Sequence, residues 1–189
     1  MTSSTFGRVV LFNGPPSSGK TSLVRSLQRE LSEPWFHLSL DNFRSGYSEQ
    51  WWDIDNGRLF HRVMNGYMAS LRELAVTGND VLAEAVITPS RQELYRLVFG
   101  DLPVVLIGVH CDRDVAIHRE RIRTNRRRGA IDLPLLEYED VHTGLVYDVN
   151  VDTSSESPEE LAARMAVNFR SLPSSSFASH TSSLNGGTQ

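Results

Sequence analysis

Short apolar runs alternate along the chain with longer segments whose apolar residues recur at helical spacing. Apolar residues dominate the runs at 8–13, 35–40, 80–87, 103–109 and 147–151, which we therefore interpret as buried strands. Helical spacing or capping residues predict helices at 22–31, 59–76, 88–99 and 157–169, with another beginning near Asp112. Buried strands joined by helices are typical of a parallel sheet covered on both faces. The pattern predicts an α/β protein with three layers around a five-stranded parallel sheet.

The chain has a size and composition that fit one folded domain. It has 189 residues, of which 40% are hydrophobic and 22% charged, which are ordinary values for a globular protein. From Pro173 onward Ser, Gly, Thr and Asn dominate. We therefore expect a domain over residues 1–172 and a disordered tail over 173–189.

The net charge and the cysteine content indicate which cellular compartment and which classes of partner to expect. The formal net charge of -4 gives no general attraction for nucleic acid, and Cys111 is the single cysteine. No signal peptide and no apolar stretch near 20 residues is recognisable. We expect a soluble, cytoplasmic protein that binds neither nucleic acid nor membrane, while its oligomeric state is not specified by any pattern.

The segment between the first predicted strand and the first predicted helix satisfies the pattern G-x-x-x-x-G-K-[ST]. Its residues, with the one that follows, are Gly14, Pro15, Pro16, Ser17, Ser18, Gly19, Lys20, Thr21 and Ser22. In this context the backbone amides and the helix N-terminus bind phosphate groups. Lys20 is expected to reach the β- and γ-phosphates of ATP, and the Thr21 hydroxyl to bind Mg²⁺.

Two carboxylates are predicted to follow the same edge of the sheet. Asp41 directly follows the second predicted strand, where it would face the ligand crevice and accept the proton of an attacking hydroxyl. The alternative is a helix-capping or turn aspartate. Glu84 lies near the end of the third predicted strand and is a candidate for Mg²⁺ binding or acceptor positioning, against a plain strand-end carboxylate.

Aromatic residues are frequent just after Asp41. Phe43, Tyr47, Trp51, Trp52 and Phe60 would either line a pocket for a partly apolar substrate or simply cover the core. Asp53 and Asp55 suit a polar or cationic substrate group, although surface charge is the default interpretation.

Arginines are concentrated within ten residues, at positions 119, 121, 123, 126, 127 and 128. They would form either a nucleic-acid contact patch or a lid, near 119–129, that closes over the nucleotide phosphates. The acidic chain and the preceding phosphate-binding loop favour the lid, and we favour Arg123 and Arg126 as the residues that stabilise the transferring charge.

Four blocks of sequence resemble the chloramphenicol phosphotransferase family. They are LFNGPPSSGKTSLVRSLQ, EPWFHLSLDNF, LIGVHCDRDVAIHRER and DVHTGLVYDVNVDTSSESPEELA. The resemblance implies a compact P-loop enzyme that transfers the γ-phosphoryl group of ATP to an antibiotic hydroxyl. It places the catalytic aspartate at Asp41 and the lid arginines at Arg123 and Arg126, and it draws attention to His142 and Asp148.

These observations predict an ATP- and Mg²⁺-dependent O-phosphotransferase whose acceptor is a hydroxyl of a small molecule. The catalytic candidates are Lys20, Asp41, Arg123 and Arg126, and the metal candidates are Thr21 and Glu84. One alternative is a metabolic kinase acting on a nucleoside, nucleotide or sugar acid. Another is a nucleotide-dependent switch, against which no Asp-x-x-Gly follows a predicted strand.

Overall fold

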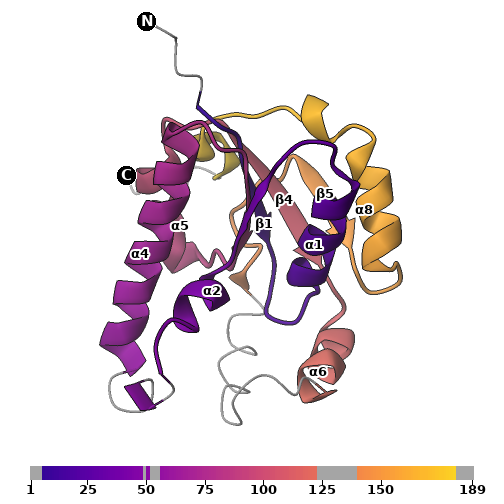
Figure 1. Cartoon of the computed structure of the whole chain (residues 1–189). Coiled ribbons are helices and arrows are strands. Elements are labelled where there is room, and N and C mark those ends of the chain that lie inside the picture. Colours follow the sequence, from indigo (N-terminus) through magenta and orange to yellow (C-terminus); the bar gives the residue numbers. More distant parts are fainter. Residues whose placement is uncertain (1–5, 49, 52–55, 123–139, 182–189) are drawn as a thin grey trace, which may run out of the picture.

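The computed structural model describes residues 6–48, 50–51, 56–122 and 140–181. Within them, five strands form one parallel sheet in the order β2-β3-β1-β4-β5 (Figure 1). The strands are β1 (Val9–Asn13), β2 (Phe36–Leu38), β3 (Val81–Ala85), β4 (Val104–His110) and β5 (Val149–Asp152). The helices are α1 (Lys20–Glu30), α2 (Leu40–Arg44), α4 (Asn56–Val76), α5 (Pro89–Phe99), α6 (Arg113–Ile122) and α8 (Pro158–Ala166), with 3₁₀ turns η1 (Phe169–Ser171) and η2 (Phe177–His180).

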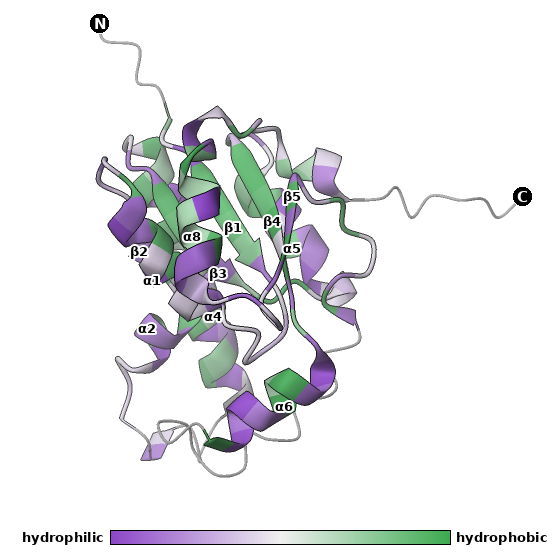
Figure 2. Ribbon diagram, turned by 90° about the vertical axis from the view of Figure 1, so that its right-hand side faces the viewer, coloured by the Kyte–Doolittle hydropathy of each residue, from purple (hydrophilic) through white to green (hydrophobic). Residues whose placement is uncertain are grey.

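The central strand β1 shows why the sheet is buried on both sides. Val9 and Leu11 point into one core, and Val10 and Phe12 point into the other, because successive side chains of a strand face opposite ways. Helices α4 and α5 cover the first core, whereas α1 and α8 cover the second. Apolar strands therefore run through the centre of the molecule between helices of mixed polarity (Figure 2). The predicted three-layer α/β fold with a five-stranded parallel sheet is confirmed.

Strand order creates a crevice at one end of β1. The chain builds β2 and β3 on one side of β1 and then crosses to build β4 and β5 on the other. Ligands of open α/β sheets bind beyond the carboxyl ends of the strands where the order switches sides. The loop after β1 and the residues that follow β2, β3, β4 and β5 therefore share one edge.

Among the strand boundaries that differ from the sequence-based expectation, those of the second and fifth strands bear on the site. The second strand ends at Leu38, and Ser39 caps helix α2, which begins at Leu40, so Asp41 lies in the first helical turn rather than at a strand end. The Asn42 Oδ1 atom accepts hydrogen bonds from the amide and hydroxyl of Ser39, which ends the extended chain there. The fifth strand begins at Val149.

The disordered tail expected from residue 173 is wrong for residues 173–181. Ser175 pairs with Val104 through two backbone hydrogen bonds of 2.9 Å, and Phe177 is fully buried in the core beside α5. Backbone pairing needs no apolar side chain, and one phenylalanine supplies the buried area, so a Ser-rich composition conceals this contact. Residues 182–189 lie outside the described part of the chain.

Among the helices that the structure describes, none combines the length and apolar character that crossing a membrane requires.

Candidate active site

The loop between β1 and α1 takes its shape from two glycines. A Cβ atom on Gly14 would lie 2.3 Å from the Val109 carbonyl oxygen, so only glycine permits this approach of β1 to β4. Gly19 has a φ of 87°, in the left-handed region that favours glycine, and immediately precedes α1. The loop thus turns sharply and presents the amino end of α1, with its partial positive charge, at the crevice.

Lys20 lies inside this loop. Its side chain is largely buried, and its Nζ atom donates hydrogen bonds of 2.8 and 2.7 Å to the carbonyl oxygens of Gly14 and Pro15. Nζ also lies 3.5 Å from Ser18 Oγ. An ammonium group enclosed by a phosphate-binding loop is positioned to contact a bound polyphosphate.

The other predicted nucleotide-binding residues form the wall of the same loop. Pro15 and Ser18 are buried, Pro16 and Ser17 are partly exposed, and the Ser17 hydroxyl donates to the Glu120 carboxylate of α6. Ser22 is exposed in the first turn of α1. The predicted set from Gly14 to Ser22 is thus contiguous in space as well as in sequence.

Thr21 and Glu84, the two predicted metal ligands, are brought into direct contact. The Thr21 hydroxyl donates to Glu84 Oε2 at 2.7 Å, and His37 of β2 donates from Nε2 to Glu84 Oε1 at 2.8 Å. Burial raises the pKa of Glu84, but the hydrogen bonds from His37 and Thr21 and the charge of Lys20 outweigh it and leave that pKa below its ordinary value. Glu84 is therefore a buried carboxylate that remains ionised.

This pair fits Mg²⁺ by its chemistry. A hydroxyl and an ionised carboxylate are hard oxygen ligands, and Mg²⁺ in phosphotransferases is held by one or two protein ligands, with phosphates and water completing the shell. No cluster of three or more His, Cys, Asp or Glu residues suited to a metal occurs in the described residues, so an all-protein cage is absent from that part of the chain. Thr21 and Glu84 would hold the ion beside Lys20.

Asp41 lies at the same edge of the sheet but two strands away from the loop. Strand β2 is separated from β1 by β3, which corresponds to roughly 10 Å across the sheet. The Asp41 side chain is 55% exposed and lies 3.9 Å from Arg44 Nη1 in the next turn of α2. It is therefore open to a ligand placed between α2 and the phosphate-binding loop.

The aromatic residues after Asp41 divide into two groups. Phe43 and Phe60 pack against the core, where Phe43 meets Tyr67 edge to face at 5.8 Å. Tyr47 and Trp51 are exposed. The contacts of Phe43 and Phe60 agree with the interpretation that these residues cover the core. Trp52, Asp53 and Asp55 lie outside the described residues.

The predicted lid falls largely outside the described residues, which include neither Arg123 nor Arg126. Arg119 of α6 belongs to the same arginine cluster but was not one of the two favoured residues, and it lies beside the loop. Its Nη2 donates to the Thr153 carbonyl oxygen at 2.7 Å, and its Nη1 would lie 3.5 Å from a Cβ on Gly19. Thr153, directly after β5, donates its hydroxyl to the Ser18 carbonyl oxygen at 2.6 Å.

A partly buried chain of polar side chains connects β1 to the segment before β5. The Ile87 amide donates to Asn13 Oδ1 at 2.8 Å, which orients the side-chain amide so that Nδ2 donates to the Tyr147 hydroxyl at 2.7 Å. The Tyr147 hydroxyl in turn contacts His142 Nδ1 at 2.7 Å. Among the hydrogen bonds of the described residues, His142 Nδ1 is the only acceptor that this hydroxyl meets. We therefore infer that the hydroxyl donates to His142 Nδ1, which leaves the imidazole proton on Nε2. We call Asn13, Tyr147 and His142 the relay.

The surroundings of the relay keep it neutral. Burial, with the nearby His110 and Lys20, lowers the pKa of His142 to about 4. The His110 ring stacks on that of His142 with centroids 4.2 Å apart. Burial raises the pKa of Tyr147 to about 12 despite the hydrogen bond from Asn13. The sequence signal for Asn13 was its polar side chain at the end of an otherwise apolar strand.

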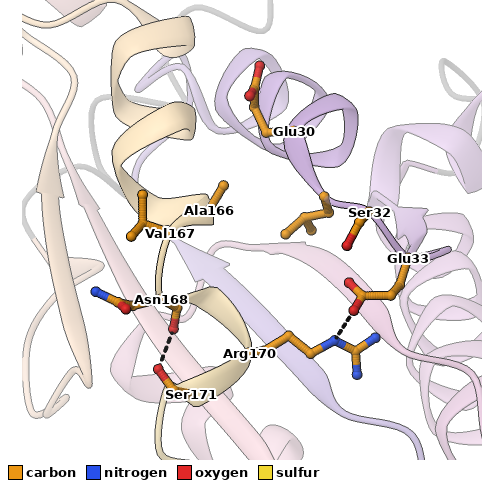
Figure 3. A pocket seen from close by; sticks show the side chains of 9 residues that line it. Glu30, Ser32, Glu33, Ala166, Val167, Asn168, Arg170 and Ser171 are labelled. Atoms are coloured by element: carbon orange, nitrogen blue, oxygen red, sulfur yellow. Dashed lines mark hydrogen bonds and ion pairs between the residues drawn. The ribbon is translucent and has the colours of Figure 1, made fainter.

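A cleft elsewhere on the surface lacks these features. It measures about 400 Å³ and lies between the carboxyl ends of α1 and α8, where Glu33 and Arg170 form an ion pair of 3.0 Å (Figure 3). It is one helix length from the amino end of α1. The polar groups described above gather at the opposite edge of the sheet, which is the candidate active site.

A parallel sheet of this strand order, with a glycine- and lysine-containing loop between β1 and α1, is the fold of P-loop kinases. The family model for chloramphenicol phosphotransferase-like proteins matches residues 7–170. The chain belongs to this family and is a phosphotransferase.

Individual proteins are similar to this chain over most of its length. A Mycobacterium tuberculosis H37Rv protein, named provisionally as an O-phosphotransferase, is 25% identical over 88% of this chain and 84% of its own. Shikimate kinase from Acinetobacter baumannii is similar in structure, with a TM-score of 0.60 and 17% identity over 89% of this chain and 95% of its own. The M. tuberculosis APS kinase has a TM-score of 0.59 and is 18% identical over 87% of this chain and 98% of its own. The two structures share the fold.

Proposed function

We propose that the protein transfers the γ-phosphoryl group of ATP to a hydroxyl group of a small molecule. The observation that carries this proposal is the contact between Thr21 and the ionised Glu84, at the amino end of the helix that also begins with Lys20. These groups match what binding of a Mg²⁺-bound polyphosphate requires. The APS kinase structure similar to this chain contains the nucleotide analogue AMPPNP, which supports a nucleotide as phosphoryl donor.

In the proposed reaction the acceptor hydroxyl oxygen forms a bond to the γ-phosphorus while the bond to the β–γ bridging oxygen breaks. ADP leaves, and the hydroxyl proton passes to the Asp41 carboxylate. Lys20 and the backbone amides of the loop stabilise the charge that develops on the transferring group. Thr21 and Glu84 would hold Mg²⁺, which would supply further neutralisation of the phosphate charge.

The exposed carboxylate of Asp41 is the reason to assign a hydroxyl rather than a phosphate acceptor. A phosphate is already ionised and needs no proton acceptor, whereas a hydroxyl does. Family membership favours an antibiotic hydroxyl such as that of chloramphenicol, and the same geometry suits a metabolite hydroxyl. Arg123 and Arg126 are proposed to close over the phosphates, as the family resemblance implies.

The test is transfer of label from γ-labelled ATP in Mg²⁺ to a panel of hydroxyl compounds, which includes chloramphenicol, other hydroxylated antibiotics, nucleosides, shikimate and sugar acids. With a positive acceptor, Asp41→Asn should lower kcat roughly 100-fold and leave the KM for ATP nearly unchanged. Unchanged kcat in Asp41→Asn would refute the base assignment, and a raised acceptor KM alone would indicate substrate positioning.

A further inference from the structure

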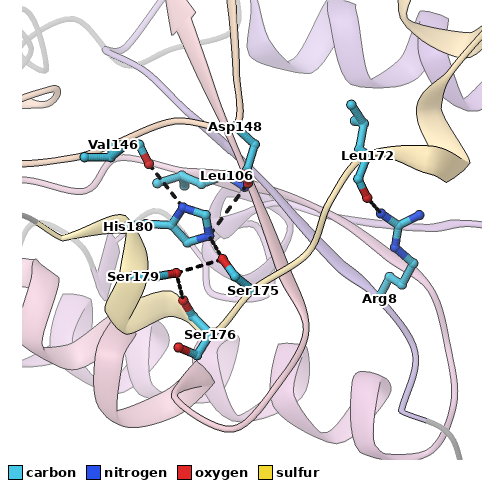
Figure 4. A network of polar contacts seen from close by, with 9 residues as sticks. All are labelled: Arg8, Leu106, Val146, Asp148, Leu172, Ser175, Ser176, Ser179 and His180. Carbon is cyan, nitrogen blue, oxygen red and sulfur yellow. Dashed lines mark hydrogen bonds and ion pairs between the residues drawn. The ribbon is translucent and has the colours of Figure 1, made fainter.

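Residues 173–181 form a strap that crosses the edge of β4 and ends beside the segment leading into β5 (Figure 4). Arg8 holds the base of the strap by donating to the Leu172 carbonyl oxygen at 2.6 Å. Ser175 pairs with Val104, and the His180 carbonyl oxygen accepts from the Val146 amide at 2.7 Å. The strap is thus attached at its base, middle and end. It lies beyond the residues that the family model matches.

His180 fastens the end of the strap to the segment 145–148. The side chain is 3% exposed, and its Nδ1 donates to the Val146 carbonyl oxygen at 3.1 Å. Its Nε2 lies 3.2 Å from Ser175 Oγ and 3.7 Å from Asp148 Oδ2. Asp148 Oδ2 also accepts from the Leu106 amide of β4 at 2.8 Å. The imidazole therefore lies between the strap, β4 and the segment before β5.

Phe177 anchors the middle of the strap in the core beside α5. Its ring is fully buried and lies 5.8 Å from the ring of Tyr95 in α5. It belongs to the core between the sheet and helices α4 and α5, whereas α1 and α8 cover the opposite face of the sheet. Phe169 is an equally buried phenylalanine in the opposite core, where it meets Trp35 at 5.2 Å.

The strap holds the segment 145–148, and this segment carries Tyr147 of the relay. Tyr147 lies between Val146 and Asp148, the two residues that His180 faces, and its hydroxyl reaches Asn13 at the end of β1. On the far side, Gln92 of α5 donates to the Thr143 carbonyl oxygen at 2.6 Å. Residues 142–148 are therefore fixed by α5 at one end and by the strap at the other.

We propose that the strap is a positioning element of the active site: by holding Val146 and Asp148 it sets the placement of Tyr147 and His142 beside the phosphate-binding loop. His180 and Phe177 are its positioning residues. The consequence for catalysis rests on the proposed phosphotransfer. The effect on the relay does not depend on that proposed function, because it concerns only which nitrogen of His142 carries the proton.

The experiment compares His180→Ala and Phe177→Leu with the matched control Phe169→Leu, which removes the same atoms from the opposite core. Two readouts are taken for each full-length protein. Nitrogen-15 NMR of the imidazoles at neutral pH reports the tautomer of His142. Steady-state hydrolysis of MgATP, with water as acceptor, reports kcat and KM for ATP. Thermal unfolding confirms that each variant is folded at the assay temperature.

We expect the wild type and Phe169→Leu to show His142 with its proton on Nε2. In His180→Ala and Phe177→Leu the relay loosens, so the tautomer signals should average toward a mixture. The kcat should fall about 10-fold or more, because small displacements of active-site groups have effects of this size. The KM for ATP should stay within about twofold, since the phosphate-binding loop makes no contact with the strap in the described hydrogen bonds.

The proposal is overturned if both strap variants keep the wild-type His142 tautomer, or if Phe169→Leu changes tautomer and kcat to the same extent. The second outcome would mean that the effect is loss of stability alone. If the wild-type protein turns over no MgATP and labels no acceptor, the proposed function fails. The tautomer comparison then still decides whether the strap positions the relay.

Discussion

Replacing Glu84 by glutamine tests the proposed metal site, because it removes the charge of the carboxylate and changes its shape very little. In the wild type both oxygens accept hydrogen bonds, one from the Thr21 hydroxyl and one from His37 Nε2. In Glu84→Gln the amide oxygen can still accept from His37, and the Thr21 hydroxyl can turn to accept from the new amide. Both hydrogen bonds survive, but neither involves a charged acceptor.

The magnitude follows from that loss of charge. Hydrogen bonds to charged groups contribute about 1.5–3 kcal/mol and neutral ones about 0.5–1.5 kcal/mol, and the relief of burying a charge offsets part of the difference. We expect a net loss of about 1–2 kcal/mol, or roughly 2–8 °C in the melting temperature for a chain of this size. The effect on phosphoryl transfer should be larger, about 100-fold or more in kcat, because charge stabilisation in the transition state is removed.

The assay is thermal unfolding across pH together with labelled-phosphoryl transfer across Mg²⁺ concentration, with Glu73→Gln on the exposed surface of α4 as control. The pKa of Glu84 is lower in the folded protein than in the unfolded chain. Its contribution to stability is therefore complete at pH values above the pKa of a glutamate in the unfolded chain, which is about 4.3. That contribution is lost as pH falls through the folded pKa. The stability gap between wild type and Glu84→Gln should therefore be constant from pH 6 to 8 and shrink in acid. Wild-type turnover by Glu84→Gln at ordinary Mg²⁺ would refute the metal assignment.

Three further changes probe the rest of the site. Lys20→Ala should lower transfer at least about 100-fold and weaken ATP binding, measured by calorimetry, while circular dichroism stays native; full turnover would remove the loop lysine from the mechanism. Tyr147→Phe breaks both relay hydrogen bonds but keeps the ring, so NMR should show a mixed His142 tautomer, and an unchanged tautomer would contradict the relay. Because the pKa of His142 is lowered to about 4, wild-type stability should fall between pH 6.5 and 4 as the unfolded chain gains a proton, and an identical slope in His142→Gln would contradict this assignment.

Local patterns determined the fold and the phosphate-binding loop. Runs such as 9–12 can be recognised as part of a buried strand because both faces of a central parallel strand are covered, so successive residues are apolar. The loop is equally local, since Gly14, Gly19 and Lys20 act within eight residues of each other. The sequence also placed Thr21 and Glu84 at one edge, because parallel strands end together.

Pairings between distant residues were decided only by the tertiary structure. Nothing near His37 in the sequence indicates that it donates to Glu84, 47 residues away, because that contact depends on β2 and β3 being neighbours. The same holds for Tyr147 and Asn13, which are 134 residues apart. Arg119 was one of several equivalent arginines until Thr153 placed it beside the loop.

The strap shows the limit of composition most clearly. Residues 173–181 contain so few apolar side chains that their composition predicts disorder, and composition is a sound guide only where a segment must bury its own surface. This segment instead uses backbone hydrogen bonds to Val104 and Val146 and inserts one ring, Phe177, into a core that other elements have already built. Such contacts depend on an edge and a cavity supplied by the folded domain, so they exist only once the sheet has formed.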